Sequence, residues 1–376
     1  MKPLGLIKRE PVLSAAVLLA VVSAFFVRPD REYAGYFDLR TLAILFSLMT
    51  VMSGLRRQGL FERAGRALLK KSGSMRRLTL LLCAMCYFGS MLITNDVALI
   101  TFVPFTFAVL SSLGEEKTEK YALPIVCMQT FAANLGSMLT PVGNPQNLYL
   151  YAKSEMSTAD FMLLMLPYAA LSAVLICVWV FLLCQGRNES ITCRSSTEAP
   201  LSRRSKRLIA MYSALFALCL LAVIRVLPYQ YALAAVFLCA AVLDRGALSG
   251  VDYSLLLTFA ALFVFIGNLG RLPAFSELLR KTVAGREVPI AILASQVMSN
   301  VPAALLLSGF TNDLRSLAVG IDLGGLGTLI ASMASLISYR QIATLMPEKK
   351  GKYILLFSSA SIVFLVFLVC LWLIIG

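Results

Sequence analysis

Long apolar runs, separated by shorter polar or basic segments, dominate this chain and predict membrane-spanning helices. We expect such helices over residues 11–27, 38–54, 160–184, 208–226, 230–243, 253–270 and 353–375. Most of these runs approach the roughly 20 residues that a helix needs to cross a bilayer. Residues 55–77 differ, because they carry eight Lys and Arg among apolar positions at helical spacing. This pattern predicts a basic amphipathic helix on the membrane surface.

Two further apolar segments are interrupted by polar residues at their centres. Residues 78–113 contain Thr94-Asn95-Asp96, and residues 288–312 contain Ser299-Asn300. Three residues are too few for a loop outside the membrane if both arms of the first segment are full spans, and these arms are short. We therefore expect two re-entrant helical hairpins with the polar residues at their tips, and two full crossings per segment are the alternative.

Two more crossings, 121–152 and 317–338, are predicted to be broken helices. Residues 134–147 contain two prolines, two glycines and three asparagines, and residues 317–338 contain four glycines. Proline removes a backbone donor, and glycine weakens a helix. Within hydrocarbon, unpaired backbone is tolerated only where it is buried in protein or lines a cavity. A broken, amide-rich crossing therefore predicts a binding site near the middle of the membrane.

The second half of the chain repeats the features of the first half in the same order: a spanning helix, an amphipathic segment, an interrupted hairpin and a broken helix. The matching positions are Asp38 and Asp252 at an offset of 214 residues, Thr94-Asn95 and Ser299-Asn300 at 205, and Gly136, Thr140 and Gly324, Thr328 at 188. Five spans separate the two hairpins. Because this number is odd, the hairpins enter from opposite faces, which is the inverted repeat of many secondary transporters.

The predicted fold is therefore an all-α polytopic membrane protein with about nine full spans and two hairpins. Its expected parts are an N-terminal repeat (1–184), a cytoplasmic linker (185–207), a connecting helix (208–226) and a C-terminal inverted repeat (227–376).

Composition and charge agree with a membrane protein that binds no nucleic acid. Of the 376 residues 59% are hydrophobic and 14% are charged, whereas a soluble domain has about a quarter charged residues. The net charge of +14 reflects topology and contact with anionic lipid, because 24 of the 34 Lys and Arg fall on one side if the N-terminus is inside. One of these segments is the basic stretch 340–352. We expect a protein of the cell (inner) membrane with its N-terminus in the cytoplasm and its C-terminus outside.

The residue types exclude several kinds of chemistry. The chain has no histidine, and its nine cysteines lie mostly in apolar runs, where they act as packing residues. No nucleophile–base pair or nucleotide-binding loop is present, so we predict no enzyme activity. We expect no cofactor and no metal other than a coupling Na⁺, with H⁺ as the alternative coupling ion.

Three stretches resemble the ion-transporter superfamily over nearly the whole chain. They are Thr94-Asn-Asp-Val-Ala-Leu-Ile, Asn134-Leu-Gly-Ser-Met-Leu-Thr-Pro-Val-Gly-Asn-Pro-Gln-Asn147 and Ser299-Asn-Val-Pro-Ala. The superfamily includes arsenite permeases, NhaD-type sodium/proton antiporters, citrate transporters and divalent-anion/sodium symporters. The chain is most similar to its short, uncharacterised anion permeases. The resemblance implies a homodimer in which a scaffold supports a mobile transport unit of hairpins and broken helices.

The resemblance is incomplete at the hairpin tips. Divalent-anion symporters carry Ser-Asn-Thr at both tips, and the third position here is Asp96 in one tip and Val301 in the other. Neither hairpin contains an arginine, so we expect no cationic pocket.

The candidate site gathers the polar residues of the tips and breaks. Asn95 and Asn300 would donate amide N–H groups to a substrate oxygen, and Thr94 and Ser299 would add hydroxyls. The remaining substrate-binding candidates are Thr140, Pro141, Gly143, Asn144, Asn147 and Thr328. The coupling-ion candidates are Asp96, Asn134, Gly136, Gly324 and Gly325. Alternatively, these side chains only cap the broken helices.

Two aspartates receive different expectations. Asp96 lies within the membrane, where an ionisable residue is costly and usually functional. It would carry a coupling proton, bind a cation permanently, or cap the second hairpin arm. Asp322 aligns with Asn134, but we expect it at the membrane edge and leave it out of the site.

These features favour a secondary active transporter of a small inorganic or carboxylate anion, coupled to sodium or protons and working by alternating access. The alternatives are a sodium/proton antiporter, an arsenite or antimonite efflux permease, and a passive anion channel.

Overall fold

A computed structural model describes residues 10–69, 72–185 and 201–376. All regular structure within these residues is helical. Most of the expected linker 185–207 lies outside the described residues, as does the basic N-terminal segment 1–9.

The helices alternate with short connections throughout both halves. Those of the first half are α2 (Pro11–Phe26), η1 (Arg31–Tyr36), α3 (Leu39–Arg57), α4 (Leu60–Leu69), α5 (Met75–Ile93), α6 (Asn95–Ser112), α7 (Glu115–Ser137), α8 (Pro145–Lys153) and α9 (Thr158–Leu183). Those of the second half are α10 (Arg203–Val223), α11 (Tyr229–Leu243), α12 (Arg245–Leu248), α13 (Tyr253–Gly270), α14 (Pro273–Val283), α15 (Glu287–Met298), α16 (Asn300–Leu307), α17 (Leu314–Gly324), η2 (Leu329–Ala331), α18 (Met333–Leu345), η3 (Pro347–Lys349) and α19 (Lys350–Ile375).

Seven helices within the described residues are long and apolar enough to cross a membrane: α3, α5, α6, α9, α10, α13 and α19. This confirms a polytopic helical membrane protein. Two of the seven, α5 and α6, are the arms that we expected to be too short for full spans. α5 begins at Met75, inside the predicted surface segment, because the Ser74 side chain accepts a hydrogen bond from Arg77 N and caps the helix there. Helix length therefore does not distinguish a hairpin from two crossings.

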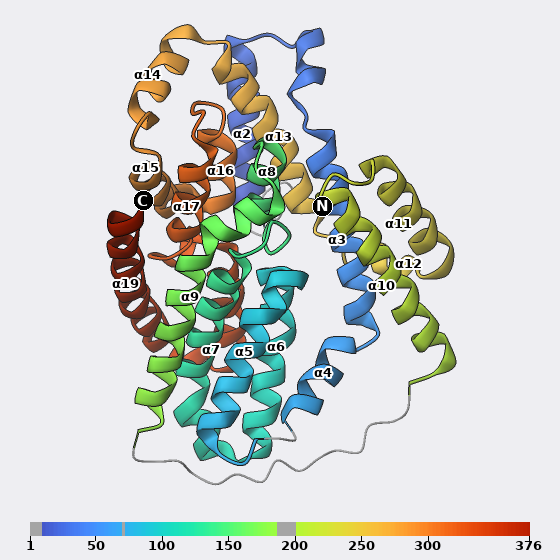
Figure 1. Ribbon diagram of the computed structural model, residues 1–376, viewed down its shortest axis with the longest axis vertical. Coiled ribbons are helices and arrows are strands. Elements are labelled where there is room, and N and C mark those ends of the chain that lie inside the picture. The colour runs from blue at the N-terminus through green and yellow to red at the C-terminus, as the bar shows by residue number, and fades with distance from the viewer. Residues whose placement is uncertain (1–9, 70–71, 186–200) are drawn as a thin grey trace.

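The helices pack as two groups (Figure 1). α7 contacts α5, α6 and α9, and these four helices run side by side in the lower part of the view. α3 packs with α10, α11 and α12 at the right, and α13 packs with α2 at the top. α8, α16 and α17 contact one another.

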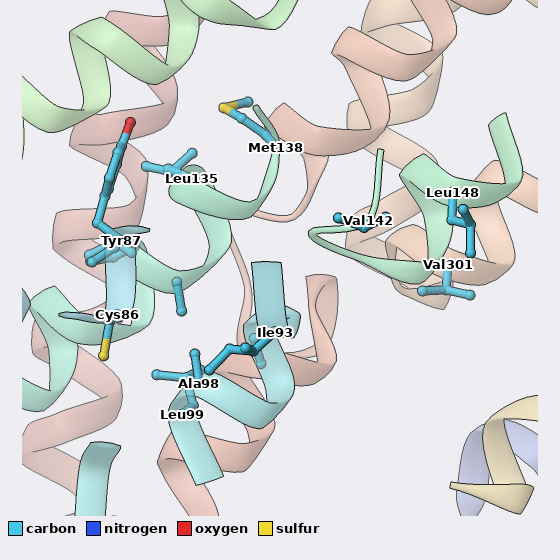
Figure 2. Close-up of a cluster of buried hydrophobic side chains, with 14 of the residues drawn as sticks. Cys86, Tyr87, Ile93, Ala98, Leu99, Leu135, Met138, Val142, Leu148 and Val301 are labelled. Carbon is cyan, nitrogen blue, oxygen red and sulfur yellow. The ribbon is translucent and has the colours of Figure 1, made fainter. Parts of the chain in front are cut away.

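Apolar side chains surround the first interrupted segment and the break that follows it (Figure 2). Ile93, Ala98 and Leu99 lie at the junction of α5 and α6, and Val142 and Leu148 lie beside Val301 of α16. All six are less than a tenth exposed. Buried apolar side chains therefore border the polar residues of both breaks.

Equivalent positions in the two halves have the same local structure. Asp38 and Asp252 cap α3 and α13, with φ of −79° at both and ψ of 85° and 83°. Ion pairs then join the halves in a crossed manner: Arg57 at the end of α3 lies 3.7 Å from Asp244, and Arg271 after α13 lies 2.7 Å from Asp30. Both the arginines and the aspartates are related by the offset of 214 residues.

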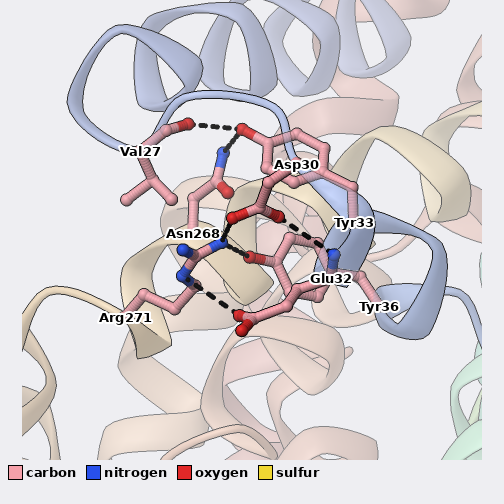
Figure 3. Close-up of polar contacts among 7 residues, drawn as sticks. All are labelled: Val27, Asp30, Glu32, Tyr33, Tyr36, Asn268 and Arg271. Atoms are coloured by element: carbon pink, nitrogen blue, oxygen red, sulfur yellow. Dashed lines mark hydrogen bonds and ion pairs between the residues drawn. The ribbon is translucent and has the colours of Figure 1, made fainter.

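The second of these ion pairs belongs to a larger cluster (Figure 3). Arg271 also contacts Glu32 and donates to the Tyr36 hydroxyl, and the Asn268 amide donates to the Tyr33 hydroxyl. These contacts fasten η1 to the end of α13, and they fix the start of α3 relative to the second half.

Candidate functional site

Both interrupted segments break at a residue with positive φ. Thr94 has φ 68° and ψ 151°, and Ser299 has φ 74° and ψ 153°. Non-glycine residues seldom adopt positive φ, and such conformations persist only where the surrounding structure enforces them. Each break ends one helix and starts the next, so Asn95 and Asn300 occupy the first positions of α6 and α16. The structure thus confirms both predicted interruptions.

The first tip is bound to the break between α7 and α8. Asn95 N donates to the Gly143 carbonyl at 3.1 Å, and the Thr140 hydroxyl donates to the Met91 carbonyl at 2.5 Å. The Asn95 amide donates to Asn134 Oδ1 at 3.1 Å. In this conformation the predicted substrate-binding amide of Asn95 is therefore used within the protein.

The second tip is bound to the break between α17 and α18 in a related way. The Thr328 hydroxyl donates to the Gln296 carbonyl at 3.4 Å, and Ser299 Oγ donates to the Ala331 carbonyl at 3.4 Å. Gln296 lies 205 residues after Met91, so Thr140 and Thr328 make the same contact in their own halves. The Gln296 side chain also donates to the Gly324 and Leu326 carbonyls. We did not predict Gln296, although an amide three residues before a tip in an apolar arm was a usable signal.

The candidate glycines allow close approach between helices. A Cβ on Gly136 would lie 2.2 Å from the Tyr87 carbonyl oxygen, and one on Gly143 would lie 2.0 Å from the Ser137 carbonyl oxygen. In the second half, a Cβ on Gly324 would meet Ser295 Oγ at 2.6 Å, and one on Gly325 would meet Asn300 Nδ2 at 3.1 Å. Packing explains these glycines directly, and their predicted role at a coupling ion remains a prediction.

A crossed pair of contacts joins the two broken helices at the centre of the molecule. Asn144, the N-cap of α8, donates to Asp322 Oδ1 at 3.3 Å. Ser332, the N-cap of α18, donates to Asn134 Oδ1 at 3.0 Å. Asn134 and Asp322 are related by the offset of 188 residues, as are Asn144 and Ser332. Each cap therefore contacts the last turns of the broken helix in the other half.

Asp322, which we left out of the predicted site, contacts the predicted site residue Asn144, and its expected position at the membrane edge stays a prediction. Its side chain belongs to this crossed pair, and the residue is 7% exposed. Among the described residues it forms no ion pair, and its Oδ2 atom has no hydrogen-bond partner. Asn147 Oδ1 and Asn134 Nδ2 are buried without partners as well. The centre of the site therefore holds a carboxylate without an ion pair and three polar atoms without hydrogen-bond partners.

Asp96 faces a cavity of about 250 Å³ that also contacts Thr94 and Asn144. Its Oδ1 atom has no hydrogen-bond partner within the described part of the chain. Arg56 and Arg340 line the same cavity, together with the acids Glu10 and Asp252. Neither arginine belongs to a hairpin, so the expectation of no cationic pocket stays a prediction. Ser299 lines a smaller cavity of about 60 Å³, and Arg340 and Asp252 line both cavities. Pro141 is buried in the break itself, and Thr328 is exposed.

A helical membrane protein that gathers its polar groups at helix breaks in its interior falls in the class of membrane transport proteins. Residues 4–312 match the family model of the citrate transporters, CitMHS, and the chain belongs to this family. The family consists of transporters and not of enzymes, which agrees with the absence of a predicted catalytic centre.

Relatives match over most of their length. The inner membrane protein YbiR of Escherichia coli is 30% identical over 331 residues, which cover 86% of each chain. The uncharacterised transporter MJ0456 of Methanocaldococcus jannaschii is 31% identical over 330 residues, which cover 87% of each chain. The crystal structure of the YdaH transporter of Alcanivorax borkumensis, described as having an unusual topology, superposes with a TM-score of 0.58 at 15% identity and covers 96% of this chain and 95% of that one. This last similarity supports the fold alone.

Proposed function

We propose that this protein is a secondary active transporter of a small anion, either an inorganic oxyanion or a carboxylate, driven by a sodium or proton gradient. The crossed contacts of Asn144 with Asp322 and of Ser332 with Asn134 carry this proposal. They bring two broken helices, two interrupted segments and a carboxylate without an ion pair to one interior point. A passive channel needs no such closed centre, whereas alternating access does.

An inverted repeat underlies this arrangement. Its support is the set of equivalent contacts: the Asp38 and Asp252 caps, the paired conformations of Thr94 and Ser299, and the crossed ion pairs of Arg57 and Arg271. Residues 1–184 form one repeat and 227–376 the other, joined by 185–207 and 208–226. α5–α6 and α15–α16 are re-entrant hairpins that enter from opposite faces.

The two helix groups have different roles. α2, α3, α10, α11, α12 and α13 form the scaffold, which pairs with a second copy of the chain in a homodimer. The hairpins, the broken helices α7–α8 and α17–α18, and helices α9 and α19 form the transport unit. The unit moves against the scaffold and exposes the site to one face at a time, with the N-terminus of the chain in the cytoplasm and the C-terminus outside. The anion and the coupling cation move together by symport, in the direction in which the cation runs down its gradient.

The substrate and the coupling cation use different groups. Asn95, Asn300 and the tip hydroxyls contact the anion once the site opens, together with the helix N-termini behind them. Asp322 balances the coupling cation, because a buried carboxylate without a basic partner needs a proton or a metal cation. The unpartnered oxygens of Asn147 and Asp96 favour a second candidate function, sodium/proton antiport, in which no anion moves.

Purified protein in liposomes tests the proposal. We expect labelled citrate, phosphate or another anion of a small panel to accumulate when a sodium or pH gradient is imposed, and to exchange in counterflow. Asn95→Ala and Asn300→Ala should each weaken uptake at least tenfold, whereas Asn312→Ala, at an exposed asparagine away from both tips, is the control. Sodium/proton exchange without anion uptake would support the antiporter. Transport of arsenite alone would support an arsenite permease. Non-saturable flux without counterflow would support a channel.

A further inference from the structure

The end of α10 has an arginine at a position where the backbone favours glycine. Arg225 follows the C-cap of α10 and has φ 65°. Arg225 N donates to the Ala222 carbonyl at 3.3 Å, and Val226 N donates to the Leu221 carbonyl at 3.0 Å. These two bonds form a Schellman motif, in which the residue with positive φ is usually glycine because glycine has no Cβ. Helix termination therefore does not explain the arginine, and its side chain needs a separate reason.

The guanidinium of Arg225 lies at the end of another helix, α8. Its Nη2 atom donates to the carbonyls of Ser154 at 2.6 Å and Tyr151 at 3.0 Å, with a longer bond of 3.4 Å to the carbonyl of Ala152. The guanidinium also lies 5.2 Å from the centre of the Tyr151 ring. A cation is favourable at a helix C-terminus, where the last carbonyls have no partner within the helix. Arg225 therefore caps α8 from outside.

Both ends of α8 reach the candidate site. At the N-terminal end, the Asn144 cap donates to Asp322 Oδ1 at 3.3 Å. At the C-terminal end, Lys153 Nζ donates at 2.6 Å to the carbonyl of Ser308, which is the C-cap of α16, and α16 begins at Asn300. α8 has nine residues, so about 13 Å of helix separates these two contacts. A displacement of α8 would therefore move Asn144 and the end of α16 together.

A third basic side chain extends this connection to α3. Arg40, in the first turn of α3, donates through Nη2 to the carbonyl of Ala222 in the last turn of α10 at 3.2 Å. Arg40, Arg225 and Lys153 thus each donate to carbonyls at the C-terminal end of another helix, in the order α10, α8 and α16. In the proposed division, α3 and α10 belong to the scaffold, and α8 and α16 belong to the transport unit. Arg225 is the member of this series that joins the two groups.

We propose that Arg225 is a positioning residue, which holds the end of α8 against the end of α10 and so keeps Asn144 in place in the transport site. The inference rests on the proposed function, because that function supplies the two helix groups and the role of the site. Hydrogen bonds from a charged donor are stronger than those between neutral groups. Without the guanidinium, the last carbonyls of α8 lose their external donor, and this end of the helix opens more often.

Hydrogen exchange in the purified full-length protein tests this role. Arg225→Gly removes the guanidinium but suits the left-handed backbone at this position. We expect exchange in residues 145–153 to be about fivefold or more faster than in wild type, and exchange in residues 219–224 to stay within about twofold. If the arginine only ended α10, glycine would leave both segments at least as well protected as in wild type. Arg207→Gln, at an exposed position near the start of α10, is the control for loss of a positive charge.

Two further variants separate the side chain from the backbone. Asparagine also tolerates positive φ and is less flexible than glycine, so Arg225→Asn should show the same fast exchange in α8. Arg225→Lys keeps a charged donor, and we expect it to bring the exchange rate of α8 back to within about threefold of wild type.

Transport supplies a readout that a merely structural role would not change. In liposomes we expect Arg225→Gly to raise the KM for citrate about threefold or more, because Asn144 is no longer held in its place. Unchanged exchange in α8, faster exchange over the whole chain, or a wild-type KM in a variant with a loosened α8 would each overturn the inference. A wild-type protein that carries no anion would instead refute the proposed function, and exchange in α8 would still show whether Arg225 holds this helix.

Discussion

At the scale of single residues, the break between α7 and α8 depends on backbone groups that lie almost in contact. Gly143 accepts a hydrogen bond from Asn95 N through its carbonyl, and the position of its missing Cβ is 2.0 Å from the Ser137 carbonyl oxygen. A Cβ at position 143 would meet the backbone of Ser137, and backbone cannot move aside as a flexible side chain can. The residue is therefore fixed as glycine by packing as well as by its place in the site.

Gly143→Ala tests this close approach. We expect it to destabilise the protein by about 2–3 kcal/mol, since overpacking at a rigid site forces the backbone apart. Gly270→Ala is the control, because nothing lies within 4 Å of its Cβ position. The measurement is the unfolding free energy in detergent, and equal stability of the two variants would contradict the packing argument.

The sequence predicted which residue types cluster at the breaks but not which side chains meet. Thr94, Asn95, Asn134, Asn144 and Ser299 stood out as polar residues in apolar runs. Asp322 aligned with Asn134 but was left out of the site, because we expected it at the membrane edge. Only the crossing of the two broken helices shows that Asn144 contacts it, and a linear pattern contains no information on contacts 178 residues apart.

Arg340 was missed for a similar reason. It begins the basic stretch 340–352, and we counted it as part of a cytoplasmic segment. α18 continues to Leu345, however, and this places Arg340 inside a helix that lines the cavity. Hydropathy shows where charged residues begin along the chain. It does not show whether the helix continues past that point or which cavity the charged side chain then lines.

At the scale of elements, crossed ion pairs lie at the ends of the long helices α3 and α13. The Arg271 guanidinium, which hydrogen-bonds Asp30, lowers the pKa of that carboxyl below its usual value of 3.8. Ionised Asp30 therefore stabilises its contact with Arg271 at pH values above 3.8. This stabilisation is lost as the pH falls through the lowered pKa of Asp30 and the carboxylate is protonated. The pair is exposed, so the effect is local to η1.

The pH dependence of this contact can be measured by hydrogen exchange in residues 28–37. We expect exchange in this segment to accelerate when the pH falls below about 4, beyond the intrinsic pH dependence of exchange. Arg271→Met should already show fast exchange at neutral pH and little further change on acidification. If residues 28–37 of the wild-type protein are equally protected from exchange above and below pH of about 4, the Asp30–Arg271 ion pair does not have this role.

The elements themselves were predicted well where a local signal exists. Both interruptions, both broken helices and the amphipathic α4 and α14 are present. The boundaries were less accurate: α7 begins at Glu115 and not at 121, and α5 begins at Met75. The Ser74 cap sets the start of α5, and Ser74 is one residue in a polar stretch with several equivalent candidates. α7 has no capping side chain, and its first turn is charged, so hydropathy alone starts the helix too late.

At the scale of the whole molecule, the proposed re-entrant hairpin of α5 and α6 can be tested against two separate crossings. A cysteine at Thr94, in a variant without native cysteines, distinguishes them. We expect a membrane-impermeant maleimide to reach it only from the face that contains Ser74 and Gly114, because a hairpin returns to the side from which it entered. Cysteines at Ser112 and Gly35 are the controls for the two faces, and labelling of position 94 from the Gly35 face alone would show two crossings.

The central claim is that Asp322, in its crossed contact with Asn144, couples cation movement to transport of an anion. The most direct measurement is citrate transport in proteoliposomes containing wild-type protein, Asp322→Asn, or the charge exchange Asn134→Asp/Asp322→Asn. We predict that Asp322→Asn abolishes gradient-driven accumulation but retains counterflow, and that the exchange, which moves the carboxylate to the equivalent place in the other half, restores part of the accumulation. Full gradient-driven accumulation by Asp322→Asn would contradict the account.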